Sequence, residues 1–90
     1  MIYKSKDGDI DLSKVTRLYP AAVIDANGEV AEMSLEWMDD NADKVKLIHY
    51  VLVFDSTPYG SEDRVRTVLT FEAKNELIES MTEVSQFFQD

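Results

Sequence analysis

The pattern of apolar residues is most distinctive at positions 45–54, VKLIHYVLVF, where a predicted strand is apolar on both faces. A strand with one solvent-exposed face alternates apolar and polar residues, whereas a strand covered on both sides is apolar nearly throughout. The sequence therefore predicts that both faces of this strand are covered. One face carries Val45, Leu47, His49, Val51 and Val53, and the other carries Lys46, Ile48, Tyr50, Leu52 and Phe54.

Further strands are predicted on either side of this segment. Residues 2–5 and 64–71 fit short strands, and residues 15–24 fit a strand in which Pro20 requires an edge position or a bulge. Asn27 and Gly28 form the strongest hairpin signal, because both residues tolerate a positive φ. Residues 30–38 alternate between apolar and polar positions and are predicted to be the second strand of that hairpin.

Closing each predicted hairpin defines a trial register. The first hairpin pairs Ala26 with Glu29, Ile24 with Ala31 and Ala22 with Met33. A loop at 39–43 pairs Leu35 with Leu47 and Glu36 with Lys46, and a loop at 56–63 pairs Val51 with Thr67 and His49 with Leu69. Since register decides which face each side chain occupies, the three hairpins together predict one core face. It holds Ile24, Met33, Leu35, Trp37, Leu47, Val51, Val53, Leu69 and Phe71.

A closing helix is predicted at residues 75–88. Leu77, Met81, Val84 and Phe88 recur at helical spacing, and Ile78 widens the apolar stripe. We expect this helix to pack on the core face and to bury Trp37 and Phe88. The chain is therefore predicted to be a single α+β domain over residues 1–90, an antiparallel β meander of five to six strands closed by one C-terminal α-helix.

The order of these elements resembles a known family. A short N-terminal hairpin, the segment Asp11-Leu12-Ser13-Lys14-Val15-Thr16-Arg17-Leu18, a meander and a C-terminal helix are similar to the small bacterial pleckstrin-homology-like domains. The resemblance implies a sheet bent into a partial barrel and a role in protein interaction. It does not imply binding of inositol phosphates, because Lys4 and Lys6 are followed at once by acidic residues.

The second face of the central strand is the strongest functional lead in the sequence. Broad apolar patches on a soluble monomer usually mark an interface. The sequence leaves three alternatives for what covers this face: another protein chain, the N-terminal hairpin through Ile2, Ile10 and Leu12, or a small ligand. The predicted interaction residues are Val23, Ile48, Tyr50, Leu52, Phe54 and Val68.

The charge balance narrows the classes of partner. Eighteen acidic residues against nine basic ones give a net charge of −9. A net negative charge of this size repels nucleic acids and anionic membranes, whose binding requires clustered lysine and arginine. The chain has no cysteine, and no segment is long and apolar enough for a signal peptide or a membrane span. We therefore expect a cytoplasmic protein with no nucleic-acid or membrane partner.

No pattern in the sequence indicates catalysis, a cofactor or a metal. Asp7, Asp9 and Asp11 resemble the start of a calcium loop, but the glycine and the glutamate that such a loop needs are replaced by Leu12 and Leu18. His49 is the only histidine, and the trial register surrounds it with apolar residues rather than with a nucleophile or a carboxylate. We expect a structural histidine and a protein that is not an enzyme.

Two functions from different classes remain open at this stage. The preferred one is a small acidic protein-interaction module that forms a homodimer, or binds another protein, through its apolar sheet face. The alternative is an acidic inhibitor that mimics nucleic acid and binds the basic groove of a DNA- or RNA-acting protein. Dependence on salt separates the two, because an ionic interface weakens steeply with ionic strength and an apolar one does not.

Overall fold

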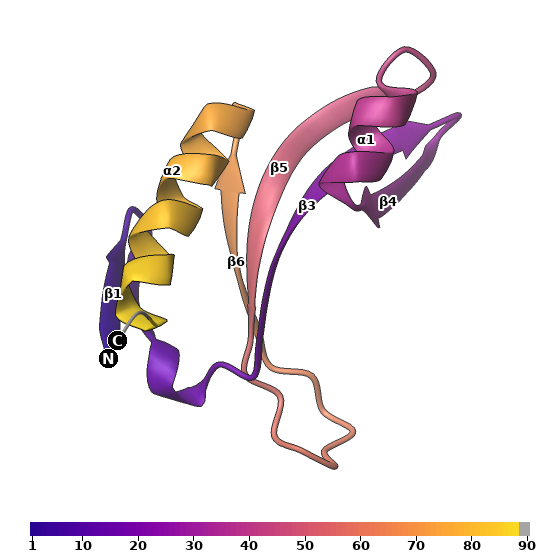
Figure 1. Cartoon of the computed structure of the whole chain (residues 1–90). Coiled ribbons are helices and arrows are strands. Elements are labelled where there is room, and N and C mark those ends of the chain that lie inside the picture. Colours follow the sequence, from indigo (N-terminus) through magenta and orange to yellow (C-terminus); the bar gives the residue numbers. More distant parts are fainter. Residues whose placement is uncertain (89–90) are drawn as a thin grey trace.

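The computed structural model describes residues 1–88 and confirms the predicted α+β class (Figure 1). Six strands, two α-helices and two 3₁₀ turns follow one another along these residues, and the second α-helix lies at the C-terminal end of the described chain. The elements are β1 Ile2–Ser5, β2 Gly8–Asp11, a 3₁₀ turn Leu12–Lys14, β3 Arg17–Ala26, β4 Glu29–Met33, α1 Leu35–Asn41, β5 Lys46–Asp55, β6 Arg66–Phe71, α2 Lys74–Ser85 and a 3₁₀ turn Gln86–Phe88.

The strands form two antiparallel sheets. The β1–β2 hairpin is one sheet, and the other has the order β4-β3-β5-β6 and is not closed into a barrel. The predicted pairing of Ala22 with Met33 and of Ala26 with Glu29 is confirmed. Asn27 and Gly28 both have a positive φ, as this tight turn requires.

Pro20 lies where β3 has only one neighbour. β4 pairs with residues 22–26 of β3, while β5 pairs with β3 from Arg17 to Asp25. The backbone nitrogen of Pro20 therefore faces a free edge, where its missing N–H removes no hydrogen bond between strands. This agrees with the edge position that the sequence predicted for Pro20.

The prediction of a strand through residues 34–38 is wrong, because α1 begins at Leu35. The Ser34 side chain accepts a hydrogen bond from the Trp37 amide at 3.1 Å, which caps the helix. The chain then passes through α1 and returns beside β3, not beside β4. The predicted pairs of Leu35 with Leu47 and of Glu36 with Lys46 therefore do not exist.

The predicted register between β5 and β6 is also wrong. Val51 lies opposite Thr70 instead of Thr67, and Leu69 lies opposite Leu52 instead of His49. The Ser56 amide bonds to the Val65 carbonyl at 2.7 Å and starts the ladder in this register. An offset of three residues is odd, so it moves every side chain of β6 to the opposite face relative to β5.

The main core therefore lies on the face of Leu52 and Phe54, which we call the inner face. The β1–β2 hairpin and α2 pack against these residues, and α1 packs farther along the same face. Tyr3 stacks on Phe54 with ring centroids 6.2 Å apart. The buried residues under the hairpin and α2 are Tyr3, Ile10, Leu12, Leu52, Phe54, Leu69, Phe71, Leu77 and Val84.

The end of the C-terminal helix differs from the prediction. α2 stops at Ser85, and Phe88 is 52% exposed rather than buried. Trp37 is half-buried among the residues that pack with α1, not beneath α2. Across residues 1–88, neither helix has the length and apolar character needed to cross a bilayer.

Candidate interaction surfaces

Two of the six predicted interaction residues lie in the core. Leu52 and Phe54 are fully buried beneath α2 and the β1–β2 hairpin. Ile10 and Leu12 are buried with them, whereas Ile2 is largely exposed. Of the three occupants that the sequence left open, the structure has the N-terminal hairpin at this position, helped by α2. The placement of Leu52 and Phe54 on an exposed patch is therefore corrected.

The other four residues are divided between the two faces of the sheet. Tyr50 is half-buried on the inner face. Val23 and Val68 lie on the opposite, outer face, opposite His49 and Val53 in the ladder. Ile48 is the extra residue of a bulge, because the pairing shifts from Val23–His49 to Ile24–Leu47. The six residues therefore do not form one contiguous patch.

The outer face has its own small cluster of buried residues. Ala21, Val51 and Val53 are buried there, and Tyr19 and Val23 pack against them. This cluster contains residues of β3 and β5 only, in contrast with the inner clusters, which include helix residues. Cover on the outer side must therefore come from side chains of the sheet itself.

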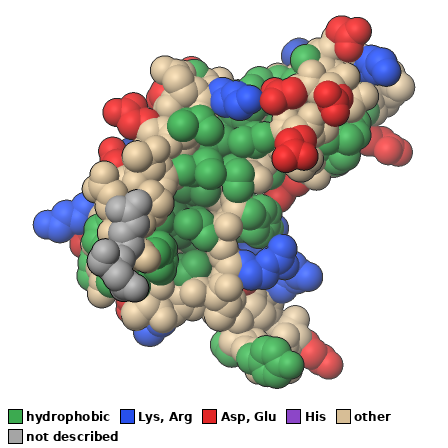
Figure 2. Space-filling view, viewed as in Figure 1, with side chains coloured by type: hydrophobic (Ala, Val, Ile, Leu, Met, Phe, Trp, Pro, Cys, Tyr) green, Lys and Arg blue, Asp and Glu red, His purple; other side chains and the backbone are tan. Residues whose placement is uncertain are grey.

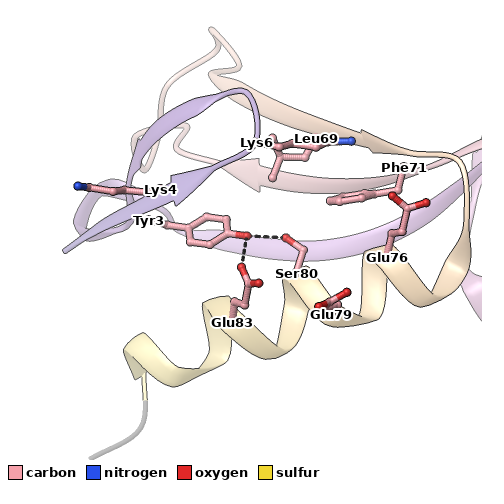
Figure 3. Close-up of a pocket in the computed structure, with 9 residues that line it drawn as sticks. All are labelled: Tyr3, Lys4, Lys6, Leu69, Phe71, Glu76, Glu79, Ser80 and Glu83. Atoms are coloured by element: carbon pink, nitrogen blue, oxygen red, sulfur yellow. Dashed lines mark hydrogen bonds between the residues drawn. The ribbon is translucent and has the colours of Figure 1, made fainter.

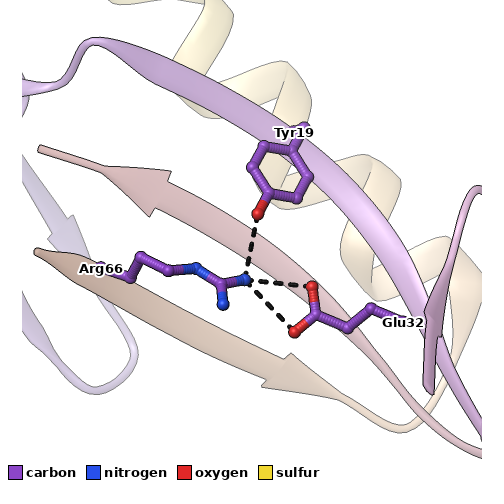
Figure 4. Close-up of polar contacts among 3 residues, drawn as sticks. All are labelled: Tyr19, Glu32 and Arg66. Atoms are coloured by element: carbon purple, nitrogen blue, oxygen red, sulfur yellow. Dashed lines mark hydrogen bonds and ion pairs between the residues drawn. The ribbon is translucent and has the colours of Figure 1, made fainter. Parts of the chain in front are cut away.

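A polar network provides part of this cover (Figure 4). Arg66 Nη2 donates to the Tyr19 hydroxyl at 3.0 Å and contacts both carboxylate oxygens of Glu32 at 3.0 and 3.2 Å. Arg66 lies opposite Asp55 and Tyr19 lies opposite Val53, so the Arg66–Tyr19 contact crosses β5 diagonally between these two positions. Arg17 lies over the Tyr19 ring at 5.2 Å. The ion pair is partly exposed, so its contribution is only about 0.2–1 kcal/mol.

His49 belongs to this outer face. It is half-buried and lies opposite Val23, not among Met33, Leu35, Leu47 and Leu69 as the trial register predicted. The correction follows from the wrong pairing of β5 described above.

The inner face carries an apolar surface between α2 and α1, which we call the apolar valley. Figure 2 shows hydrophobic side chains gathered there, between α2 and the acidic surface near α1. Tyr50 and Leu35 contact both inner clusters and remain half-buried, and Leu18 and Pro20 continue the inner face along β3. The valley residues are Leu18, Pro20, Leu35, Tyr50, Ile78 and Met81.

The orientation of α2 places Ile78 and Met81 on the valley side. Lys74 Nζ contacts Asp39 of α1 at 3.2 Å, so this side of α2 faces α1. Ile78 and Met81 follow Lys74 by four and seven residues and therefore share its helix face. Met81 is half-buried, but Ile78 is 44% exposed. The valley consequently has an exposed apolar residue on its rim as well as an apolar floor.

A hollow of mixed polar and apolar lining lies on the other side of α2 (Figure 3). It has a volume of about 340 Å³, and we call it the glutamate groove. Leu69 and Phe71 of β6 and Tyr3 of the hairpin supply its apolar surfaces, and three glutamates of α2 supply one wall. The lining residues are Tyr3, Lys4, Lys6, Leu69, Phe71, Glu76, Glu79, Ser80 and Glu83.

Tyr3 joins the hairpin to α2 at this groove. Its hydroxyl shares a hydrogen bond with the buried Ser80 hydroxyl at 2.8 Å and donates to Glu83 Oε2 at 3.0 Å. Burial raises the pKa of Tyr3 above its ordinary value of 10.0, and the nearby Glu83 carboxylate adds to the shift. The hydroxyl is therefore a stable donor between the two elements at neutral pH.

Titration with alkali should show this shift. Because the folded-state pKa of Tyr3 is raised, the stability it contributes is complete below pH 10.0 and is lost as the pH rises through the folded-state pKa. We expect a tyrosine ionisation step above pH 10 in the absorbance at 295 nm. Tyr3→Phe should remove this step, and Tyr59→Phe, which alters a fully exposed side chain, should leave it in place. If the ionisation step above pH 10 persists in Tyr3→Phe, the step does not belong to Tyr3.

The acidic N-terminal turn has a structural role. The Asp11 side chain accepts hydrogen bonds from the Ser13 hydroxyl at 2.6 Å and the Ser13 amide at 3.0 Å, which caps the first 3₁₀ turn. Hydrogen bonding to Ser13 lowers the pKa of Asp11. Within residues 1–88, no three His, Asp or Glu side chains are grouped so as to hold a metal ion.

Comparisons with protein families, curated proteins and solved structures found no match to this chain. The similarity to pleckstrin-homology-like domains therefore stays a prediction. The candidate surfaces have to be judged on their own geometry.

Proposed function

We propose that the protein is a small protein-interaction module that forms a homodimer through the apolar valley. The observation that carries the proposal is the gathering of half-buried and exposed apolar side chains between α2 and α1 (Figure 2). Removing such a surface from water is the main driving force for protein association. The predicted residue Tyr50 lies in this valley, with Leu52 beside it in the core.

The shape of the surface favours a second copy as the partner. A two-fold interface brings the same patch of both copies together, so the patch must be complementary to itself. Ile78 lies exposed on α2 at the rim of the valley, where its side chain is free to pack on the valley of a second copy. A domain of 90 residues also gains much from burying further apolar surface.

The test is the oligomeric state of a variant with a charge on the rim. Ile78→Lys should give a folded monomer, because the lysine stays solvated in the monomer but would be desolvated in the dimer. Val30→Lys is the matched control, since Val30 lies on β4 outside the valley and is 64% exposed. Light scattering coupled to size exclusion should show a dimer for the wild type and the control.

The salt dependence of the dimer provides the second measurement. An apolar interface should persist from low salt to about 1 M salt, where the Debye length is near 3 Å. A wild type that is monomeric at all concentrations, or a dimer that dissociates as salt rises, would overturn the proposal. A dimer in which Ile78→Lys has no effect would place the interface elsewhere.

A further inference from the structure

β6 has a free edge, and the direction of its backbone groups can be derived. The Val65 carbonyl accepts from Ser56 and so points toward β5. In an antiparallel strand the direction alternates from residue to residue, so the N–H and C=O groups of Arg66, Val68 and Thr70 point away from β5. The Lys6 ammonium, which donates to the Thr70 carbonyl, confirms this direction. Within residues 1–88, no strand pairs with this edge of the sheet.

The glutamate groove lies beside this edge. Leu69 and Phe71 of β6 line it, and the opposite wall is the face of α2 that carries Glu76, Glu79 and Glu83. These glutamates follow one another by three and four residues and thus share one helix face. From Glu76 to Glu83 the helix rises about 10 Å, which equals the length of about three residues of a strand.

Lys6 shows how a cation is held at this position. Its ammonium lies 4.2 Å from the centre of the Phe71 ring and donates to the Thr70 carbonyl. An ammonium over an aromatic face is favourable, and the backbone carbonyl accepts one of its three N–H donors. Lys6 is an exposed residue of the hairpin turn, so this long side chain can leave the site without disturbing the core.

We propose that the free edge of β6 and the glutamate groove together bind an extended, lysine-containing segment of a partner protein. The segment adds to β6 as a strand, and its backbone bonds to Val68 and Thr70. Its lysine side chains enter the groove, where they meet Glu76 and Glu79, and one of them replaces Lys6 on Phe71. Its alternate side chains fall on the outer face beside Val68, which is exposed and apolar.

The charges of the chain favour this occupant. Three glutamates face two lysines in the groove, and the whole chain carries a charge of −9. A cationic segment is therefore attracted, and an acidic segment is repelled. The site is separate from the apolar valley, since the two lie on different sides of α2, so either proposal can fail alone.

The experiment is a titration of the ¹⁵N-labelled protein with an acetylated and amidated Lys-Val-Lys-Val-Lys-Val peptide. The amide signals of Val68 and Thr70 should shift, and these amides should become protected from hydrogen exchange. Glu76→Gln/Glu79→Gln should bind about tenfold more weakly, because two ion pairs are lost. Glu29→Gln/Glu62→Gln is the control with an equal change of charge and should bind as the wild type does.

Lys6→Ala tests the replacement step. Binding should tighten in this variant, because the peptide no longer competes with Lys6. An unaltered affinity, or equal binding of a Glu-Val-Glu-Val-Glu-Val peptide, would overturn the proposal. If spermidine binds while the peptide leaves Val68 and Thr70 unchanged, the groove is a small polyamine site. If two copies of the Lys6→Ala protein pair through β6 and the peptide does not bind, Lys6 only prevents edge-to-edge pairing, and the proposal is overturned.

Discussion

Leu52→Lys is expected to unfold the protein and not merely to separate two copies of it. Leu52 is fully buried, and it lies between Pro20 and Leu69 in the sheet and beneath the hairpin and α2. A lysine at this position would leave an unpaired ammonium in an apolar core. The expected cost is at least about 4 kcal/mol, a large share of the 5–15 kcal/mol that stabilises a typical domain. Circular dichroism during thermal unfolding measures this loss.

Val30→Lys is the matched control, because it introduces the same side chain at an exposed site outside the valley. This variant should melt close to the wild-type temperature. If Leu52→Lys instead folds and melts like the control, α2 and the hairpin do not cover the inner face. Leu52 would then be available for an intermolecular contact, as the sequence alone had suggested.

The parts of the fold that follow local rules could be predicted from the sequence. The β3–β4 register depends on a two-residue turn, and Asn27 and Gly28 have the positive φ values that such a turn requires. The C-terminal helix was predicted because Leu77 and Val84 recur at helical spacing over several turns. In both cases the residues that determine the structure are neighbours in the chain.

The predictions failed in two situations. In one, a short segment fits both a strand and a helix; in the other, residues far apart in the sequence determine the strand register. Residues 34–38 alternate like a strand, but Leu35 and Met38 also have helical spacing, and Ser34 is a good N-cap. Periodicity cannot separate these possibilities over so few residues. The β5–β6 register depends on a loop that spans residues 56–65, and no short-turn rule sets the pairing across such a loop.

The candidate surfaces were predictable only in part. The apolar run at residues 45–54 predicted cover on both faces of β5, and this holds for residues 51–54, which are buried on both faces, but not for Ile48, which is 45% exposed. It could not identify the cover on the outer face, because Tyr19, Glu32 and Arg66 come from three different strands and are polar or amphipathic. The spacing of Glu76, Glu79 and Glu83 does give a sequence signal for the acidic wall of the groove. Its apolar floor comes from β6 and the hairpin, which only the folded chain brings together.

Phe54→Ala is expected to destabilise the protein by about 3–5 kcal/mol, the usual cost of removing a buried phenylalanine. Phe54 is fully buried, packs with α2 and the hairpin, and stacks on Tyr3. The truncation leaves a cavity at the contact between the two elements that close the inner face. Urea unfolding followed by the fluorescence of Trp37, the only tryptophan, measures the free energy of unfolding.

Phe88→Ala is the matched substitution in the 3₁₀ turn that follows α2, where the sequence predicted a buried side chain. Since Phe88 is 52% exposed, its truncation should change the free energy of unfolding by no more than about 0.5 kcal/mol. The comparison decides which phenylalanine holds the helix to the sheet. A large loss for Phe88→Ala with a small one for Phe54→Ala would mean that the helix packs on the Val51 and Val53 face. The inner and outer faces would then have to be exchanged, and the valley and the groove would not exist as described.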